Sequence, residues 1–228
     1  MKTISALLAL GAAFALPTAA MAKEGDASPV TVSFSLTGAT DYVWRGVSQS
    51  NEDPAVFATA QVNYGGFYAG AGTENVDFAG VKQEYDLWGG YVFDLGGAKL
   101  DVGAVRYGYV DAGANIDTLE GKIGLSGTVG KLGLGATAYH TGNYFGTSEP
   151  ATYVEANAAY PLTDKLSASG AFGHQQIDNL PDYNTWNLGL SYDVLKGAKV
   201  DVRYHDTDTN AFGTLGDSRV VGSFTVGF

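Results

Sequence analysis

The chain has 228 residues, with 13 Lys and Arg against 24 Asp and Glu and a formal net charge of −11 at pH 7. This excess of acidic residues disfavours nucleic acid as a partner. There is no cysteine, which excludes a disulfide framework and a cysteine metal site or nucleophile. The 32 glycines show no Gly-X-Y period, and prolines number only 6 while aromatic residues are frequent, so the composition fits neither collagen nor disorder.

The first residues are typical of a secretory signal peptide. A short basic start precedes an apolar run at residues 7–16, and Ala-Met-Ala at residues 20–22 offers a cleavage site. The apolar run is about half the roughly 20 residues that a spanning helix needs. We therefore expect residues 1–22 to be a cleaved signal peptide, residues 23–29 to be an exposed lead, and residues 30–228 to form one domain.

The rest of the chain alternates between apolar and polar residues with a period of two, which predicts β-strands. Trp186, Leu188 and Leu190 share one face, for example, while Asn187 and Ser191 share the other. The pattern predicts twelve strands, at residues 30–45, 55–64, 67–76, 83–94, 99–110, 118–129, 132–141, 152–160, 165–175, 184–194, 199–206 and 219–228.

Short turns and longer polar links alternate between these strands. Gly65-Gly66 and Gly96-Gly97 are typical of tight turns. An even number of strands, short turns at one end and long loops at the other are typical of a barrel in the outer membrane. The predicted fold class is therefore all-β: a transmembrane antiparallel up-and-down β-barrel of about 12 strands, with short periplasmic turns and longer extracellular loops.

Aromatic residues near both ends of the strands favour a membrane barrel over a soluble one, because they are enriched at both bilayer interfaces. One group lies near the short turns (Phe67, Phe93, Tyr160, Tyr192 and Phe228) and the other near the long loops (Tyr42, Trp44, Tyr85, Trp186 and Tyr204). In the fifth strand the alternation changes phase near Ala104. We predict a β-bulge there, which would turn Arg106 into the lumen.

A series of short motifs gives a family resemblance. The motifs are Asp41-Tyr42, Arg45-Gly46, Ser48-Gln49, Pro54-Ala55, Tyr68-Ala69-Gly70 and Asn75-Val76-Asp77-Phe78, followed by Glu84-Tyr85-Asp86-Leu87 and Tyr153-Val154-Glu155. In this order they resemble the TorF-type family of outer-membrane porins, proteobacterial proteins long catalogued as conserved and of unknown function. Thr40 and Phe57-Ala58 depart from the family pattern near a loop. The resemblance implies a multi-pass β-barrel in the outer membrane of a Gram-negative bacterium.

The charged residues on the predicted inward faces are candidates for a lumen or constriction site. They are Asp41, Arg45, Asp86, Asp101, Glu120, Lys122, Glu155, Asp201, Arg203, His205 and Arg219. Mixed charge can form a wet, selective constriction, and acidic long loops would concentrate cations at the mouth. We therefore expect a porin-like channel for passive diffusion of small solutes or ions, with a weak cation preference.

Two alternatives stay open. Facing acids and bases could pair and plug the barrel, which would leave a sealed structural or adhesion-type barrel without transport. An outer-membrane lipid-modifying enzyme is the other, since His140 and His174 fall on the predicted lipid face, but no nucleophile-elbow motif is present. We expect no enzymatic activity.

The sequence also bears on ligands and partners. The three histidines are dispersed and have no metal-ligand spacing, so we expect neither a metal nor another cofactor. The expected partners are outer-membrane lipid and lipopolysaccharide. The last strand, ending in Phe228, resembles the closing strand of outer-membrane barrels, whose final Phe is read by the barrel-insertion machinery. The oligomeric state has no signature in the sequence.

Overall fold

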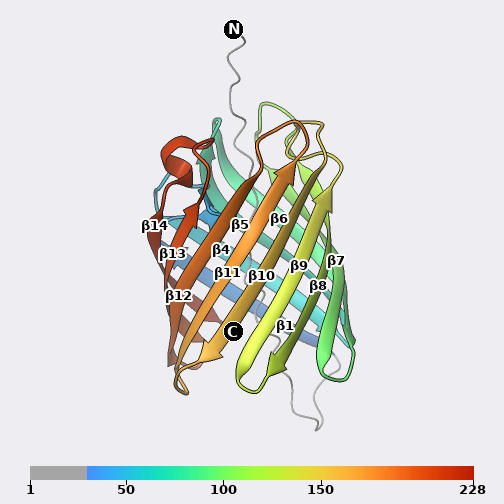
Figure 1. Ribbon diagram of the computed structural model, residues 1–228, viewed down its shortest axis with the longest axis vertical. Helices are drawn as coiled ribbons and strands as arrows, with labels where there is room; N and C mark the ends of the chain where they lie inside the picture. Colours follow the sequence, from blue (N-terminus) through green and yellow to red (C-terminus); the bar gives the residue numbers. More distant parts are fainter. Residues whose placement is uncertain (1–29) are drawn as a thin grey trace.

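The computed structural model describes residues 30–228. The expected signal peptide at residues 1–22 and the lead at residues 23–29 lie outside the described residues. The chain forms one barrel, with long loops at one end and short turns at the other (Figure 1).

Twelve strands close the barrel, and each pairs antiparallel with its neighbours. They are β1 (Val30–Ala39), β4 (Ala55–Tyr64), β5 (Phe67–Phe78), β6 (Val81–Asp94), β7 (Ala98–Tyr109), β8 (Thr118–Val129), β9 (Leu132–Thr141), β10 (Ala151–Pro161), β11 (Leu166–Ile177), β12 (Tyr183–Leu195), β13 (Ala198–Thr207) and β14 (Arg219–Gly227). Two more strands, β2 (Val43–Trp44) and β3 (Val47–Ser48), form a separate small hairpin. The predicted twelve-stranded antiparallel barrel is confirmed.

The loop between β13 and β14 contains the short 3-10 helix η1 (Gly213–Gly216). Among residues 30–228, no helix has the length and apolar character needed to cross a membrane.

The first and last strands of the barrel pair with each other. In their register Leu36 lies opposite Val226, and the amide of Phe34 donates to the carbonyl of Phe228 at 2.8 Å. The two phenylalanine rings stack with centroids 5.9 Å apart. Closure leaves no unpaired sheet edge, which a bilayer requires because lipid cannot hydrogen-bond to the backbone.

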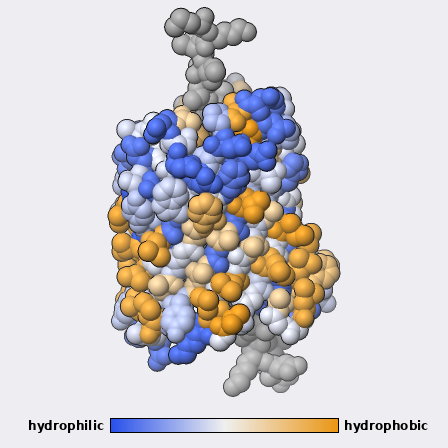
Figure 2. Space-filling model, in the orientation of Figure 1, coloured by the Kyte–Doolittle hydropathy of each residue, from blue (hydrophilic) through white to orange (hydrophobic). Residues whose placement is uncertain are grey.

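The outer face of the barrel is apolar. Leu119, Leu188 and Val220 are each more than 60% exposed, and hydrophobic side chains gather in a band below the hydrophilic long loops on the face shown in Figure 2. Water would not tolerate an apolar surface of this extent, whereas a bilayer matches it. Most apolar residues of the strands therefore face outward, and most polar residues face the lumen.

The predicted first strand is too long. The structure ends β1 at Ala39 rather than Arg45, and the chain then turns into the barrel. Arg45 and Gly46 adopt positive φ angles of 44° and 83°, the conformation that a tight hairpin turn between β2 and β3 requires. The prediction that Tyr42 and Trp44 join the outer aromatic belt is therefore wrong, because both side chains are buried inside the barrel.

The predicted bulge in the fifth strand is also wrong. Strand β7 pairs in continuous register with both neighbours, with Arg106 opposite Leu87 and Leu119. The Arg106 side chain faces outward, is 51% exposed and pairs with Asp117 at 2.6 Å. The inward positions are taken by Val105, Tyr107 and Tyr109, which are buried. Which side chains of β7 face inward thus depends on their packing against the other residues in the lumen.

Candidate functional site

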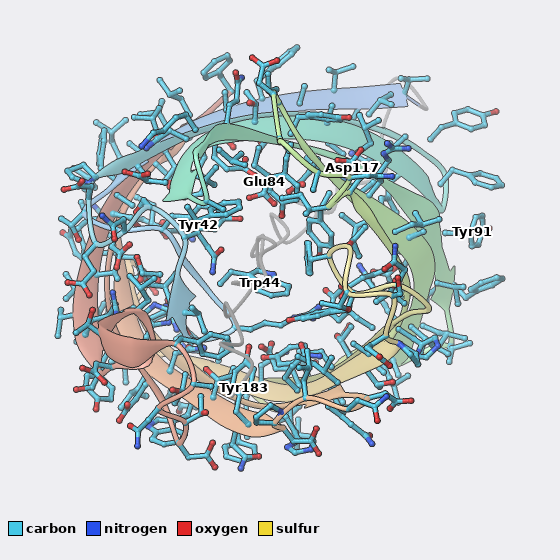
Figure 3. All side chains as sticks on the ribbon, turned by 90° about the horizontal axis from the view of Figure 1, so that it is seen from above. Tyr42, Trp44, Glu84, Tyr91, Asp117 and Tyr183 are labelled. Carbon is cyan, nitrogen blue, oxygen red and sulfur yellow. The ribbon has the colours of Figure 1, made fainter. Side chains whose placement is uncertain are left out.

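Residues 40–54 are here called the inner loop, and residues 41–50 of it are buried or partly buried inside the barrel at the end that carries the long loops, whereas residues 51–54 are exposed. Trp44 and Val47 are almost completely buried, and Figure 3 shows Trp44 near the centre of the barrel, whereas Tyr91 lies outside the wall. The amide of Gln49 donates to the carbonyl of Tyr42 at 2.6 Å, and the amide of Asp77 donates to the carbonyl of Gln49 at 2.8 Å. The inner loop is therefore hydrogen-bonded both to itself and to strand β5.

Asp41 organises the start of the inner loop. Its carboxylate accepts a hydrogen bond from Ser48 Oγ at 2.6 Å, and Ser50 Oγ lies 2.8 Å away. Arg219, at the start of β14, pairs with the other carboxylate oxygen at 2.9 Å and lies 3.7 Å from Glu52. Asp41 thus joins the two ends of the hairpin to the last strand.

Arg45 holds the tip of the inner loop against the far wall. Its guanidinium donates to both oxygens of Glu120 on β8, at 3.1 and 2.6 Å, and to Gln175 on β11 at 2.7 Å. It also lies 4.0 Å from the ring of Trp44 and 4.2 Å from the ring of Tyr153, distances at which a cation is attracted to an aromatic face. Burial alone lowers the pKa of Arg45, but the adjacent Glu120 outweighs this and raises the pKa above its usual range. The guanidinium of Arg45 therefore stays charged although it is buried.

Aromatic side chains fill the space around this ion pair. Trp44 meets Tyr107 and Phe145 edge to face, with centroids 6.1 and 5.7 Å apart. Phe145 belongs to a second loop that reaches inward, together with Tyr144, and both are buried. The outer part of the lumen therefore contains a cluster of buried hydrophobic side chains.

Three carboxylates meet behind the inner loop, on strands β5 and β6. One oxygen from each of Glu74, Glu84 and Asp86 lies within 4.8 Å of the others, and all three residues are buried. Glu84 accepts hydrogen bonds from Tyr42 at 3.4 Å and from Tyr109 at 3.1 Å. Burial and the negative charge of Glu84 raise the pKa of Tyr42 well above its usual range, so Tyr42 remains a donor.

A second group of charged residues lines the half of the lumen nearer the short turns, here called the lower lumen. Lys122 pairs with Asp101 at 2.6 Å, and Arg203 pairs with Asp201 at 3.1 Å. Tyr68 donates to Asp101 at 2.7 Å. These side chains are only partly buried, in contrast to those around the inner loop.

The eleven predicted site residues divide between these surroundings. Asp41, Arg45, Glu120 and Arg219 hold the inner loop, and Asp86 belongs to the carboxylate group. Asp101, Lys122, Asp201 and Arg203 form the pairs of the lower lumen. Glu155 accepts a hydrogen bond from Tyr153 at 2.9 Å, and His205 is half-buried in β13 opposite Arg219.

The sequence reasoning missed several residues of the site, among them Glu74, Glu84 and Gln175. A signal for two of them was present, since Glu84 shares the parity of Asp86 and Glu74 shares that of the inward Tyr68. Gln175 and Arg45 are 130 residues apart in the sequence, and no local sequence pattern predicts their contact.

The closed sheet, the apolar exterior and the polar lumen together define a porin-like β-barrel of the outer-membrane type. Residues 23–225 match the family described as "Bacterial protein of unknown function (Gcw_chp)", and the chain belongs to this family. The porin activity implied by the TorF-type resemblance does not follow from this match. A search of curated proteins finds no significant relative.

Solved structures with a similar fold are outer-membrane porins and channels. The KdgM porin has a TM-score of 0.62 at 9% identity, over 86% of this chain and 98% of that one. The NanC porin has a TM-score of 0.59 at 11% identity, over 85% and 97%. An outer-membrane channel from Pseudomonas putida F1 has a TM-score of 0.51 at 10% identity, over 91% and 100%. At these identities the likeness concerns the fold alone.

Proposed function

We propose that the protein is a porin-like channel of the outer membrane for passive diffusion of small solutes or ions, with the inner loop as its constriction. The observation that carries the proposal is that the lumen is filled at its outer end by the inner loop and is partly open in the lower lumen. The inner loop crosses the lumen, and Arg45 at its tip bonds to Glu120 and Gln175 on the opposite wall. In the lower lumen, polar side chains stay partly exposed. Twelve strands lie between the eight that side chains can fill and the 16 or more of open porins, so a loop is needed to narrow the passage.

The charge balance of the lumen supports a weak cation preference. Arg45, Lys122, Arg203 and Arg219 each pair with a carboxylate. Among the other inward carboxylates, that of Glu155 is partly exposed and takes part in no ion pair within the described part of the chain. Acidic groups in a narrow lumen favour cations over anions.

The excess of acidic groups in the lumen also indicates which class of solute the channel would favour. The KdgM porin has also been solved with disordered oligogalacturonate, and that structure has a TM-score of 0.60 to this chain at 10% identity. Galacturonate chains are polyanions, which an acidic lumen repels. For this protein we therefore propose small cations or small neutral solutes rather than acidic oligosaccharides.

The alternative function is a sealed structural barrel, and the dense packing around Trp44 and Arg45 is the observation that favours it. In that case the polar lower lumen would be a blind, water-filled vestibule. The enzyme alternative has less support, because His140 and His174 are exposed on the outer surface, where they hydrogen-bond to Thr152 and Asn184.

The proposal also includes the surroundings of the barrel. Its apolar band would contact outer-membrane lipid, and the long loops would contact lipopolysaccharide. The terminal strand, with Phe228 paired to Phe34 at the closing seam, would be the segment that the insertion machinery engages.

Planar-bilayer recordings test the channel directly. We expect a small conductance whose reversal potential in a KCl gradient indicates cation preference. Because Gln49 bonds to Tyr42 across the base of the hairpin, residues 43–48 can be replaced by a Gly-Gly turn. This variant should conduct several times more than the wild type and should let larger solutes swell liposomes.

A matched control is the replacement of residues 178–181 by Gly-Gly, since this loop is exposed at every position; its conductance should equal that of the wild type. Anion preference would overturn the proposed selectivity. If the wild type conducts nothing, the passive-channel proposal is wrong, and opening by the hairpin deletion would then assign the inner loop to a sealed barrel.

A further inference from the structure

The group formed by Glu74, Glu84 and Asp86 lacks any positive partner. None of the ion pairs in the described residues involves these three side chains. Neighbouring carboxylates repel one another when ionised, and burial strengthens the repulsion. Elsewhere in the same layer the chain avoids this cost, as where Glu120 faces Arg45.

The hydrogen bonding of the group is incomplete as well. When Glu74 and Asp86 are ionised, all four of their carboxylate oxygens are buried without a hydrogen-bond donor among the described residues. Buried polar atoms are almost always paired, so these oxygens require an explanation. They converge with Glu84 to within 4.8 Å, and a ligand between them would need to be small and positive.

We propose that Glu74, Glu84 and Asp86 bind a divalent metal ion inside the barrel, with Ca²⁺ as the ion that fits best. The donors are all carboxylate oxygens, which hard cations prefer. Two oxygens on opposite sides of Ca²⁺ are about 4.6–5.2 Å apart, given Ca–O distances of 2.3–2.6 Å, so the observed spread suits it. Mg²⁺ usually retains several waters, and the packed surroundings of Asp86 leave little room for them.

The surroundings order the proposed ligands. Tyr42 and Tyr109 each donate to one oxygen of Glu84, which leaves both oxygens a free lone pair and fixes the orientation of the carboxylate. Support of this kind around metal ligands increases affinity. Since Tyr42 belongs to the inner loop, the ion would also neutralise charge directly behind that loop.

Calcium titration of the detergent-folded, EDTA-treated protein tests the site, and it does not depend on whether the barrel conducts. We expect one Ca²⁺ per chain by calorimetry, and Tb³⁺ in place of Ca²⁺ should luminesce when tyrosine is excited, because Tyr42 and Tyr109 contact Glu84. Glu74→Gln and Asp86→Asn should each weaken binding at least tenfold. Glu155→Gln is the matched control, because Glu155 is also an inward carboxylate without a basic partner but lies outside the group. This variant should bind Ca²⁺ as the wild type does.

Thermal unfolding gives a second measurement that guards against misfolded variants. Ca²⁺ should raise the unfolding temperature of the wild type but not that of Asp86→Asn, and in EDTA the variant should be more stable than the wild type because a repulsive charge is gone. The proposal is overturned if the wild type binds neither Ca²⁺ nor Tb³⁺, since the carboxyls would then hold protons instead. Equal binding by Asp86→Asn and the wild type would also overturn it.

Discussion

The lumen has an outer layer, formed by the inner loop and the residues around Arg45, and a lower layer, which is the lower lumen. Both layers contain the same kinds of ion pair, but in different surroundings. The Arg45 and Glu120 side chains are 3% and 2% exposed, whereas those of Lys122 and Asp101 are 10% and 19% exposed. Around Arg45, aromatic rings and a second hydrogen-bond acceptor replace water. Around Lys122, water can still reach both partners.

This difference determines what each pair does. A buried pair leaves an uncompensated charge when one partner is removed, so its loss is costly. A pair that water reaches contributes little, because solvent substitutes for the missing partner. We therefore infer that the ion pairs of the outer part of the lumen fasten the inner loop, while those of the lower lumen would set the charge that a solute meets in the proposed channel.

The largest effect is expected for Arg45→Ala. The change leaves Glu120 buried without its partner and removes the contacts with Trp44 and Tyr153, so we expect a loss of about 3–5 kcal/mol in the free energy of unfolding. Urea unfolding in lipid vesicles measures it, and hydrogen exchange of residues 40–54 should show whether the inner loop has come free.

The double variant Arg45→Ala/Glu120→Gln serves as the control, because it removes the unpaired charge and should recover part of the loss. Arg45→Lys should restore less than full stability, since an ammonium cannot bond to both oxygens of Glu120 and stack as a guanidinium does. A cost below ~1 kcal/mol for Arg45→Ala, the range of exposed pairs, would break the contrast between the layers.

A smaller effect is expected for Lys122→Gln in the lower lumen. The Lys122–Asp101 pair is partly hydrated, so we expect a loss of about 1 kcal/mol or less in unfolding free energy. The freed carboxylate of Asp101 should instead increase cation preference, measured as a shift in reversal potential. Asp101→Asn should shift it the opposite way. If Lys122→Gln destabilises the barrel as much as Arg45→Ala does, the lower lumen is not hydrated as described.

The smallest effect concerns Asp208, in the exposed loop that follows β13. Hydrogen bonds from the backbone and side-chain amides of Asn184, at 2.7 and 2.6 Å, lower the pKa of Asp208 below its ordinary value of 3.8. A lowered pKa contributes stability that is present above the unfolded value and is lost as the pH falls through the folded value. The protection factor of the Asn184 amide, which is the intrinsic exchange rate divided by the observed rate at the same pH, should therefore decrease as the pH falls below 3.8.

The control for this prediction is Asp208→Asn, which cannot ionise. Its Asn184 amide should exchange faster than in the wild type at neutral pH, and this difference should vanish in acid. Conductance should be unaffected, because Asp208 lies outside both layers of the lumen. If the protection factor of the Asn184 amide changes neither with pH nor with the substitution, the assigned hydrogen bonds are contradicted.

The sequence by itself determined the strands, their order and the face of most side chains. Alternation places Leu119 outward and Glu120 inward whatever surrounds them, because successive side chains of a strand point to opposite faces. It also predicted that residues 219–228 close the barrel against the first strand, since an up-and-down barrel without edges leaves no other pairing.

Only the tertiary structure decided what fills the lumen. Residues 40–45 continue the alternation of the first strand, so nothing local shows that Tyr42 and Trp44 turn inward. Their burial depends on Glu120, Gln175 and Tyr153, which lie far along the chain and meet Arg45 only once the barrel is closed. The inward phase of Tyr107 and the outward position of Arg106 follow from that packing. Likewise, parity could place Glu74, Glu84 and Asp86 on the inner face, but only the pairing of β5 with β6 brings their carboxylates together.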